Sequence, residues 1–435
     1  KQPALQGNAA KSMIQRPPNK LCPPGRTFKG SFMKYDLDRV IDRDGTGSAK
    51  WDNYMGGRHS GPTTSINADL NDDGSIPMWV ADMDFQVPKP VVDALAERVQ
   101  HGIFGYTMAT DGYYQSVINW FGRRHNWEIS KDWISTAPCI VPPVHFAVRT
   151  YCRPGDKVLI QKPVYYPFFR SITNGGCEIV SSPLIDNDGH YEMDFDDLEV
   201  RAADPKVKLA ILCSPHNPVG RVWTRDELQR YGEICTRHGV LVVADEIHCD
   251  LMMPGNEFEP YGLLHEDLVK NSIICTAPSK TFNLAGMHLS NMVIPDKDLH
   301  KAYAAYMAQI GVAGGLNPLA TTAVEAAYNG GEEWLAQVLN YIAGNHQHLK
   351  TFMANNIPRI KVYDLEGTYL NWMDFNDLGL DRKALEDLTQ LKAKVLFDEG
   401  YIFGDEGIGF ERINLACPRP ILDAALQRLK KSIEG

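Results

Sequence analysis

The fold of this chain is decided by one short stretch, Thr276-Ala277-Pro278-Ser279-Lys280-Thr281-Phe282-Asn283-Leu284-Ala285-Gly286. It directly follows the apolar run Ser272-Ile273-Ile274-Cys275. A short apolar run that leads into a polar turn predicts a buried strand that brings a residue to a site, and here that residue is Lys280. Burial would disfavour the ammonium form and lower the lysine pKa, which leaves a neutral amine able to form a Schiff base with an aldehyde.

Lys280 could also be a surface lysine in a loop, or part of a different motif. A phosphate-binding P-loop needs glycines ahead of its Gly-Lys-Ser/Thr end, and none precede Ser279. A serine acylase of the Ser-x-x-Lys type needs serine at position 277, where the chain has Ala277. Neither motif is present, so the choice between a surface lysine and a site lysine depends on partners elsewhere.

Two other predicted strands end in polar side chains that could share a site with Lys280. The apolar run 208–213 leads into a Pro/Asn/Gly turn that contains Asn217, and a second apolar run leads into Asp245 and His248. The carboxyl ends of parallel strands form the ligand crevice of an open α/β sheet, so these residues are expected to converge. A carboxylate that keeps a ring nitrogen protonated and a lysine that holds an aldehyde suit a pyridine cofactor.

With these motifs, the sequence resembles a fold-type I pyridoxal-5'-phosphate (PLP) enzyme of the class I/II aminotransferase superfamily. Residues 76–85, Ile-Pro-Met-Trp-Val-Ala-Asp-Met-Asp-Phe, and the Asp-Glu-Ile-His sequence at 245–248 resemble the MalY/PatB group of cystathionine β-lyase-like carbon–sulfur lyases. The resemblance covers residues 32–433. It implies PLP as cofactor, an amino acid as substrate and a homodimer with shared active sites.

The resemblance also implies roles for individual residues. The implied cofactor site comprises Lys280, Asp245, Asn217, His248, Tyr165, Ile140, Val141, Ser279, His288 and Tyr106. Within it Lys280, Asp245 and Tyr106 are the catalytic residues, and Tyr106 would reach the phosphate of the neighbouring subunit. Arg412 would bind the substrate α-carboxylate with Ala81 and Asn217 beside it, because a planar guanidinium suits two-point binding.

The phosphate is expected at a helix N-terminus that follows residue 139. Residues 133–142 indicate a strand, a tight turn and a helix with Pro142 in its first turn, and a helix N-terminus presents free N–H groups to an anion. Cys139 stands where relatives commonly carry glycine. His288 stands where many aminotransferases carry an arginine that clamps the phosphate, so it would supply one hydrogen bond or be structural.

Composition narrows the class of protein. The chain has 435 residues, 44% of them hydrophobic, and a formal net charge of −10, which opposes nucleic acid or an anionic membrane as partner. No apolar run is long enough to span a bilayer. Its nine cysteines include no Cys-x-x-Cys pair, so we expect neither disulfides nor a metal site, and a cytoplasmic location.

The expected fold is α/β. A large PLP-dependent transferase-type domain, 75–330, would hold a mainly parallel sheet flanked by helices, and residues 32–74 with 331–435 would form a smaller α+β domain after an N-terminal extension, 1–31. The elements expected in the C-terminal part are strand 368–374, helix 382–397, strand 400–403, strand 411–415 and helix 420–432. Helices are also expected near 298–309, 317–328 and 332–354.

Two reactions would use the same central residues. Lys280 would remove the α-proton of an amino acid, after which either a thiolate leaves the β-carbon or a proton returns and transamination follows. The 76–85 stretch and His248 favour the β-lyase by resemblance, with an aminotransferase as the alternative. A PLP-sensing transcription regulator is a remote alternative, because the residues ahead of Lys34 are too few and too rich in proline for a winged helix-turn-helix.

Overall fold

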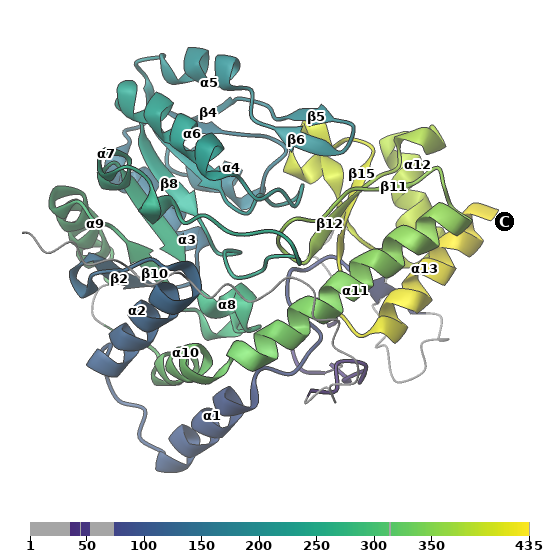
Figure 1. The fold of residues 1–435 in the computed structure, drawn as a ribbon, viewed down its shortest axis with the longest axis horizontal. Helices are drawn as coiled ribbons and strands as arrows, with labels where there is room; N and C mark the ends of the chain where they lie inside the picture. The colour runs from purple at the N-terminus through teal and green to yellow at the C-terminus, as the bar shows by residue number, and fades with distance from the viewer. Residues whose placement is uncertain (1–34, 44, 53–73, 313–314, 435) are drawn as a thin grey trace, which may run out of the picture. The chain divides into compact units, whose positions relative to one another are not determined.

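The computed structural model describes residues 35–43, 45–52, 74–312 and 315–434, so the predicted extension 1–31 and residues 53–73 of the predicted small domain lie outside it. Its central feature is a seven-stranded sheet (Figure 1). In spatial order the strands are β2 (Ile134–Ala137), β10 (Ser290–Val293), β9 (Ser272–Thr276), β8 (Leu241–Asp245), β7 (Val207–Cys213), β3 (Lys157–Ile160) and β4 (Glu178–Ser181). The pairs from β9 to β4 are parallel, and β10 is antiparallel to both neighbours. The predicted mainly parallel sheet is confirmed.

The sheet separates two hydrophobic cores. Alternate residues of β7 point to opposite faces, so Ala210 and Leu212 enter one core while Leu209 and Ile211 enter the other. Strands buried on both faces need apolar residues at nearly every position, which explains the uninterrupted apolar runs. One core includes side chains of α2 (Asp111–His125), α5 (Phe195–Ala202), α6 (Arg225–Arg237) and α10 (Pro318–Gly330); the other includes those of α3 (Val141–Tyr151), α4 (Pro167–Thr173) and α9 (Lys297–Gln309).

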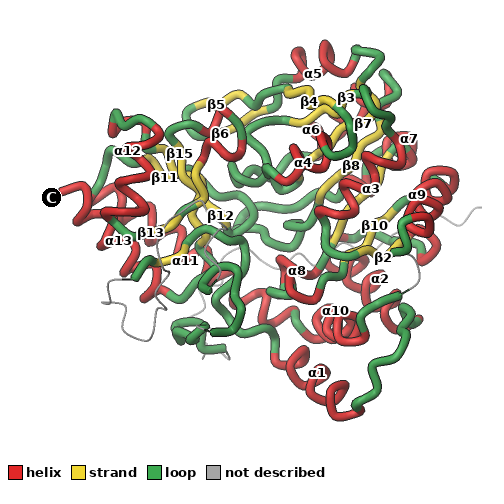
Figure 2. The backbone as a smooth tube through the Cα atoms, turned by 180° about the vertical axis from the view of Figure 1, so that it is seen from behind, coloured by secondary structure: helices red, strands yellow, loops and turns green. Residues whose placement is uncertain are grey.

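The C-terminal part forms a second, four-stranded sheet (Figure 2). Its order is β11 (Lys361–Val362), β12 (Leu370–Asp374), β15 (Phe410–Asn414) and β14 (Asp398–Glu399), with all pairs antiparallel. The long α11 (Glu332–Asn356) packs against α13 (Arg419–Glu434) beside it (Figure 1). Short pairs elsewhere are β1 (Ile76–Pro77) with β13 (Val395–Leu396) and β5 (Ile185–Asn187) with β6 (His190–Glu192).

Two predicted elements of this part are wrong. Residues 400–403 form a 3-10 turn rather than a strand, and the strand pairing falls on Asp398–Glu399 just before them. Gly400 lies so close to the Gly407 backbone that no side chain would fit at either position. The apolar residues of this segment do not reveal this close backbone approach. The predicted helix 382–397 is α12 (Arg382–Glu386) followed by a π-helical turn to residue 392, and Lys394 then takes a left-handed φ of 53°.

The other helix predictions hold. Helices α9, α10 and α11 match the ranges expected near 298–309, 317–328 and 332–354. Thr224 closes a capping box at the start of α6, and α1 (Lys89–His101) ends at the left-handed Gly102. Val91 is the one fully buried residue of α1, and Val92 and Val99 are half exposed. Two further short helices are α7 (Glu266–Lys270) and α8 (Pro278–Thr281). Within the described ranges, no helix combines the length and apolar character needed to cross a bilayer.

Candidate active site

Lys280, Asp245 and Asn217 follow three adjacent parallel strands. Cys213 of β7 is in register with Asp245 at the end of β8, and Asp245 is in register with Cys275 of β9. Asn217 therefore comes four residues and Lys280 five residues after aligned positions, with Lys280 in the short helix α8. The predicted convergence at the carboxyl edge of the sheet follows from this register.

These residues surround a cavity of about 420 Å³, a size suited to a small ligand. Nine of the predicted site residues line it, namely Ala81, Ile140, Val141, Tyr165, Asn217, Asp245, His248, Ser279 and Lys280. The remaining lining residues are Cys139, Pro142, Cys213, Ile247, Ala285 and Leu289. Most of the predicted cofactor residues thus share one space with the N-terminus of α3.

Burial shifts the pKa values of the charged residues in this cavity. Burial, together with the positive charge of Arg412, lowers the pKa of Lys280 to about 8 against the opposing charges of Asp82 and Asp245. It raises the pKa of Asp245 to about 7, against the hydrogen bond from the Ile247 N–H and the charge of Lys280. The predicted neutral amine is therefore accessible near neutral pH.

His248 is neutral in this setting. Burial, followed by the positive charges of Lys280 and Arg412, holds its pKa well below the usual value. The ring packs edge-to-face against Tyr369 at 6.1 Å between centroids. Its Nδ1 atom is buried and has no hydrogen-bond partner among the described residues. An unpartnered buried nitrogen destabilises the fold unless a bound ligand provides the missing hydrogen bond.

Arg412 lies beside the cavity but is not among its lining residues. Its Nη1 donates to Asn217 Oδ1 at 2.8 Å, and its Nη2 donates to the Trp79 carbonyl oxygen at 3.0 Å. Nη2 also forms an ion pair with Asp398, and the guanidinium lies over the Phe403 ring. The contacts of Arg412 with Asp398 and with the Trp79 carbonyl oxygen were not predicted, because the first arises from sheet register and the second from tertiary packing of the irregular segment after β1.

The structure does not bring Tyr106 and His288 into the cavity lining. Tyr106 is fully exposed on the surface. His288 Nδ1 lies 2.9 Å from the thiol of Cys139, whose pKa is raised by burial, and it thus contacts the site through a residue at the cavity wall. Cys139 and His288 both have left-handed φ values, 55° and 54°, a region that favours glycine. This geometry would suit the glycine that the resemblance implies at position 139.

The 76–85 stretch, which we call the 76–85 wall, is held in place by hydrogen bonds from distant parts of the chain. Asn283 accepts from Met83 N at 2.9 Å and donates to the Met83 and Phe85 carbonyl oxygens. Asn414 donates to the carbonyl oxygens of residues 80 and 82, each at 2.7 Å. These two asparagine side chains satisfy backbone N–H and carbonyl groups of the stretch that would be paired with a neighbouring strand in a regular sheet.

An N-terminal arm completes the fastening of this wall. The fully buried Lys50 forms an ion pair with Asp84 at 2.6 Å, and the Trp51 indole donates to the same carboxylate at 2.8 Å. Arg43 forms ion pairs with Asp84 and Asp82. The carboxylate of Asp84 thus has three donors from one segment, as a buried charge requires.

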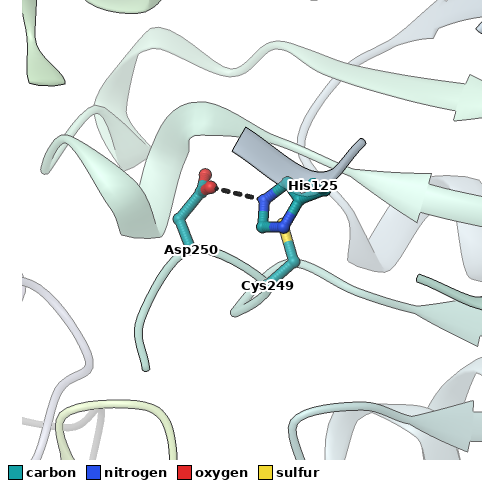
Figure 3. Close-up of side chains that lie close together, drawn as sticks. All are labelled: His125, Cys249 and Asp250. Carbon is teal, nitrogen blue, oxygen red and sulfur yellow. Dashed lines mark hydrogen bonds and ion pairs between the residues drawn. The ribbon is translucent and has the colours of Figure 1, made fainter. Parts of the chain in front are cut away.

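A second group of potential ligand atoms lies outside the cavity. His125, Cys249 and Asp250 lie close enough to hold a metal ion (Figure 3). The Asp250 carboxylate, however, already accepts from His125, Trp120 and Thr281 and forms an ion pair with Arg124 at 2.9 Å. A guanidinium in contact with the carboxylate opposes a cation, so this cluster is structural and ties α2 to the helix that carries Lys280.

The donor set of the cavity fits a pyridine aldehyde phosphate. A buried carboxylate faces a lysine of lowered pKa, an aromatic ring of Tyr165 is present for stacking, and the start of α3 offers N–H groups to an anion. The unpartnered His248 Nδ1 is a further polar group that a ligand could satisfy. The fold and this cavity define an α/β enzyme whose active site lies at the carboxyl edge of its sheet.

Comparison with known proteins agrees with that class. Residues 76–429 match the family model for aminotransferase class I and II, and the chain belongs to this family. Cystathionine beta-lyase PatB of Bacillus subtilis is 40% identical over 92% of this chain and 100% of its own length, and Protein MalY of Escherichia coli is 30% identical over 92% and 99%. The structure of cystalysin from Treponema denticola, which contains pyridoxal 5'-phosphate, superposes with a TM-score of 0.86 at 40% identity, covering 92% of this chain and 99% of that chain.

Proposed function

We propose that this protein is a PLP-dependent carbon–sulfur β-lyase that cleaves L-cystathionine or a related cysteine S-conjugate to pyruvate, ammonia and a thiol. The observation that carries the proposal is the convergence of Lys280 and Asp245 on one cavity, which Ala81 of the 76–85 wall also lines. The names of PatB and the cofactor content of cystalysin support it.

The chain's own residues would hold the cofactor as follows. Lys280 would hold its aldehyde, Asp245 and Asn217 its ring edge, and Tyr165 its ring face, with His248 nearby. Its phosphate would lie at the N–H groups of Ile140 and Val141 with the Ser279 side chain, and His288 would act through Cys139. When bound, PLP supplies an aldehyde that captures the substrate amino group and a ring that accepts electrons from the bonds that break.

Lys280 is the base in this proposal. Its lowered pKa of about 8 gives a substantial neutral fraction near neutral pH, so the amine can accept the α-proton of the substrate. A negatively charged Asp245 would stabilise a protonated ring nitrogen, and a cationic ring would in turn favour the ionised carboxylate. Loss of the β-thiolate then releases the thiol, and water converts the remainder to pyruvate and ammonia.

Arg412 would bind the substrate α-carboxylate, with Asn217 and Ala81 beside it. Its planar guanidinium donates to Asn217 of the cavity lining and to the Trp79 carbonyl oxygen, two residues from Ala81, whose carbonyl oxygen accepts from Lys280. A carboxylate fixed at this point would direct the side chain of the substrate toward the 76–85 wall. This orientation would place the sulfur substituent where the wall can select it.

We also propose a homodimer in which Tyr106 reaches the phosphate of the neighbouring subunit. Support comes from exposed apolar side chains in α1 and in the segment after it, namely Val92, Val99, Ile103, Phe104, Tyr106 and Met108. Large apolar side chains left exposed close together in the sequence are consistent with an interface. Tyr106 has no contact with the cavity of its own chain, so a role in the site would need a second subunit.

The remaining proposals concern organisation and location. The separate seven-stranded and four-stranded sheets support a large domain, 75–330, and a small domain, 32–74 with 331–435. All eight cysteines within the described residues are unpaired, which supports the reducing cytoplasm as location.

The test is an incubation of the PLP-loaded protein with L-cystathionine, L-cysteine and a bulky cysteine S-conjugate in the absence of any keto acid. Pyruvate, ammonia and thiol formed in equal amounts over many turnovers are the expected result. If products form only when a keto acid is added, and a new amino acid accumulates in step, the protein is an aminotransferase and the lyase proposal is wrong.

A further inference from the structure

Arg412 already has a carboxylate partner from its own chain. Its Nη2 forms an ion pair with Asp398, and the two side chains are only 3% and 2% exposed. The residues face each other across the β14/β15 pairing, where Asp398 is the register partner of Arg412. A buried carboxylate therefore occupies the guanidinium to which we assign the carboxylate of the substrate.

The hydrogen bonds of Arg412 leave no free pair of donors for a second carboxylate. A guanidinium has five N–H groups, and a carboxylate bound at two points takes one from Nη2 together with one from Nε or Nη1. Both Nη2 hydrogens are engaged, with the Trp79 carbonyl oxygen and with Asp398. Nε has no partner among the described residues, and Nη1 donates to Asn217. Two-point binding of a substrate thus requires one partner of Nη2 to leave.

Of these two partners, Asp398 is the one that can leave without movement of the backbone. The Trp79 carbonyl belongs to the wall, and the residues on either side of it are fixed by hydrogen bonds. The Met78 N–H donates to the Leu396 carbonyl oxygen at 2.8 Å, and Asn414 donates to the Val80 carbonyl oxygen at 2.7 Å. A carboxylate side chain can turn about its own bonds.

We propose that Asp398 is a resident ligand of Arg412, which holds the guanidinium in position and is displaced from Nη2 by the α-carboxylate of the substrate. The proposal rests on the role assigned to Arg412 under the proposed function. One carboxylate then exchanges for another, so the affinity for an α-amino acid reflects competition with Asp398. Asp398 is a positioning residue in this account, since it acts through Arg412.

The test uses the PLP-loaded protein and Asp398→Asn. The amide oxygen of asparagine still accepts a hydrogen bond from Nη2, but the negative charge that competes with the substrate is gone. Two probes are titrated by calorimetry: L-alanine, which has a carboxylate but no β-leaving group, and ethylamine, which has no carboxylate. We expect the variant to bind L-alanine about tenfold more tightly and ethylamine unchanged, because only the carboxylate meets the altered charge.

A second substitution and two controls make the result decisive. Asp398→Ser, with a shorter side chain, is expected to change L-alanine affinity in the same direction. Asp374→Asn removes a buried carboxylate of β12 that accepts hydrogen bonds from Asn376 and not from Arg412, and it is expected to change neither affinity. Arg412→Lys is expected to weaken L-alanine binding about tenfold or more, since two-point binding is lost.

The outcomes separate the two proposals. If Arg412→Lys leaves L-alanine binding unchanged, the carboxylate role of Arg412 fails and the displacement of Asp398 fails with it. If Arg412→Lys weakens binding but both Asp398 variants bind L-alanine no more tightly than the unaltered protein, the displacement alone is overturned. Failure of the lyase reaction is read separately, from pyruvate and thiol.

Discussion

The Lys280 amine lies 2.6 Å from the carbonyl oxygen of Ala81, and the hydroxyl of Tyr369 donates to the same oxygen at 2.8 Å. One backbone carbonyl thus joins the proposed base to the 76–85 wall. Because the wall is fastened by asparagine side chains and buried ion pairs, this contact gives the amine a defined position whenever it is not attached to another group.

Lys280→Ala should abolish covalent attachment of PLP. The unaltered protein loaded with PLP is expected to absorb visible light, to lose that band on borohydride reduction and to carry the added mass on the peptide that contains Lys280. Lys270→Ala, which removes an exposed lysine on α7, serves as the matched control and should retain the band. A reduced adduct mapped to any other lysine would contradict the assignment.

The rate of PLP attachment should rise with pH and level off with a midpoint near 8. Burial lowers the pKa of Lys280 to about 8, so below this pH the amine is protonated and cannot attack the aldehyde, whereas above it the amine is neutral. Stopped-flow absorbance of the cofactor-free protein measures the rate. Asp245 titrates near 7, so the midpoint should be measured in Asp245→Asn as well. A midpoint above 10 in both proteins would show that the amine is not in an environment that lowers its pKa.

Asp245→Asn should lower turnover by about a hundredfold or more while PLP still binds, because a neutral amide cannot stabilise a protonated ring nitrogen. The loss should appear in kcat rather than in KM. Pyruvate release from L-cystathionine measures it, with Asp204→Asn, a partly exposed aspartate paired with Lys157, as the control. Turnover close to that of the unaltered protein would remove Asp245 from the mechanism.

Val99→Glu and Phe104→Glu should dissociate the proposed dimer, since each places a charge in exposed apolar surface near Tyr106. Sedimentation equilibrium should give the mass of one chain for these variants and of two for the unaltered protein. Val200→Glu alters an equally exposed valine on α5 and should leave the mass unchanged. A monomeric unaltered protein would exclude the shared site.

Asp84→Ala should destabilise the protein by about 3 kcal/mol or more, because it leaves the buried Lys50 charge without its partner. Urea unfolding measures the change. The exposed pair Lys270–Glu266 offers the contrast, and Glu266→Ala should leave the unfolding midpoint nearly unchanged. Equal effects of the two substitutions would mean that the Lys50–Asp84 ion pair does not stabilise the 76–85 wall.

Strand order and turn chemistry allowed the central site to be predicted. Asn217, Asp245 and Lys280 each follow an apolar run, and parallel strands in sequence bring such ends to one edge. Seven of the nine predicted cavity residues follow these strands or lie at the start of α3, whereas Ala81 and Tyr165 came from the resemblance. The mainly parallel sheet was predictable for the same reason.

Contacts that depend on tertiary register were not predictable. Asp398 faces Arg412 only because the two-residue strand β14 pairs with β15 at that point. The apolar residues of 400–403 predicted a strand there, whereas the paired residues are 398 and 399. The pairing of His288 with Cys139 depends on two left-handed residues, which local propensity does not favour. Tyr106 stays a prediction, because its proposed role needs a second chain.

The fastening of the 76–85 wall has a consequence for how the protein reaches its native state. Its ties come from positions as far apart in the chain as Arg43, Asn283 and Asn414, so closure of very long loops precedes completion of the wall. Because these contacts need such long loops to close, we expect the 76–85 wall to form late in folding. A nascent or partly unfolded chain would therefore lack a selective pocket even when its parallel sheet is already formed.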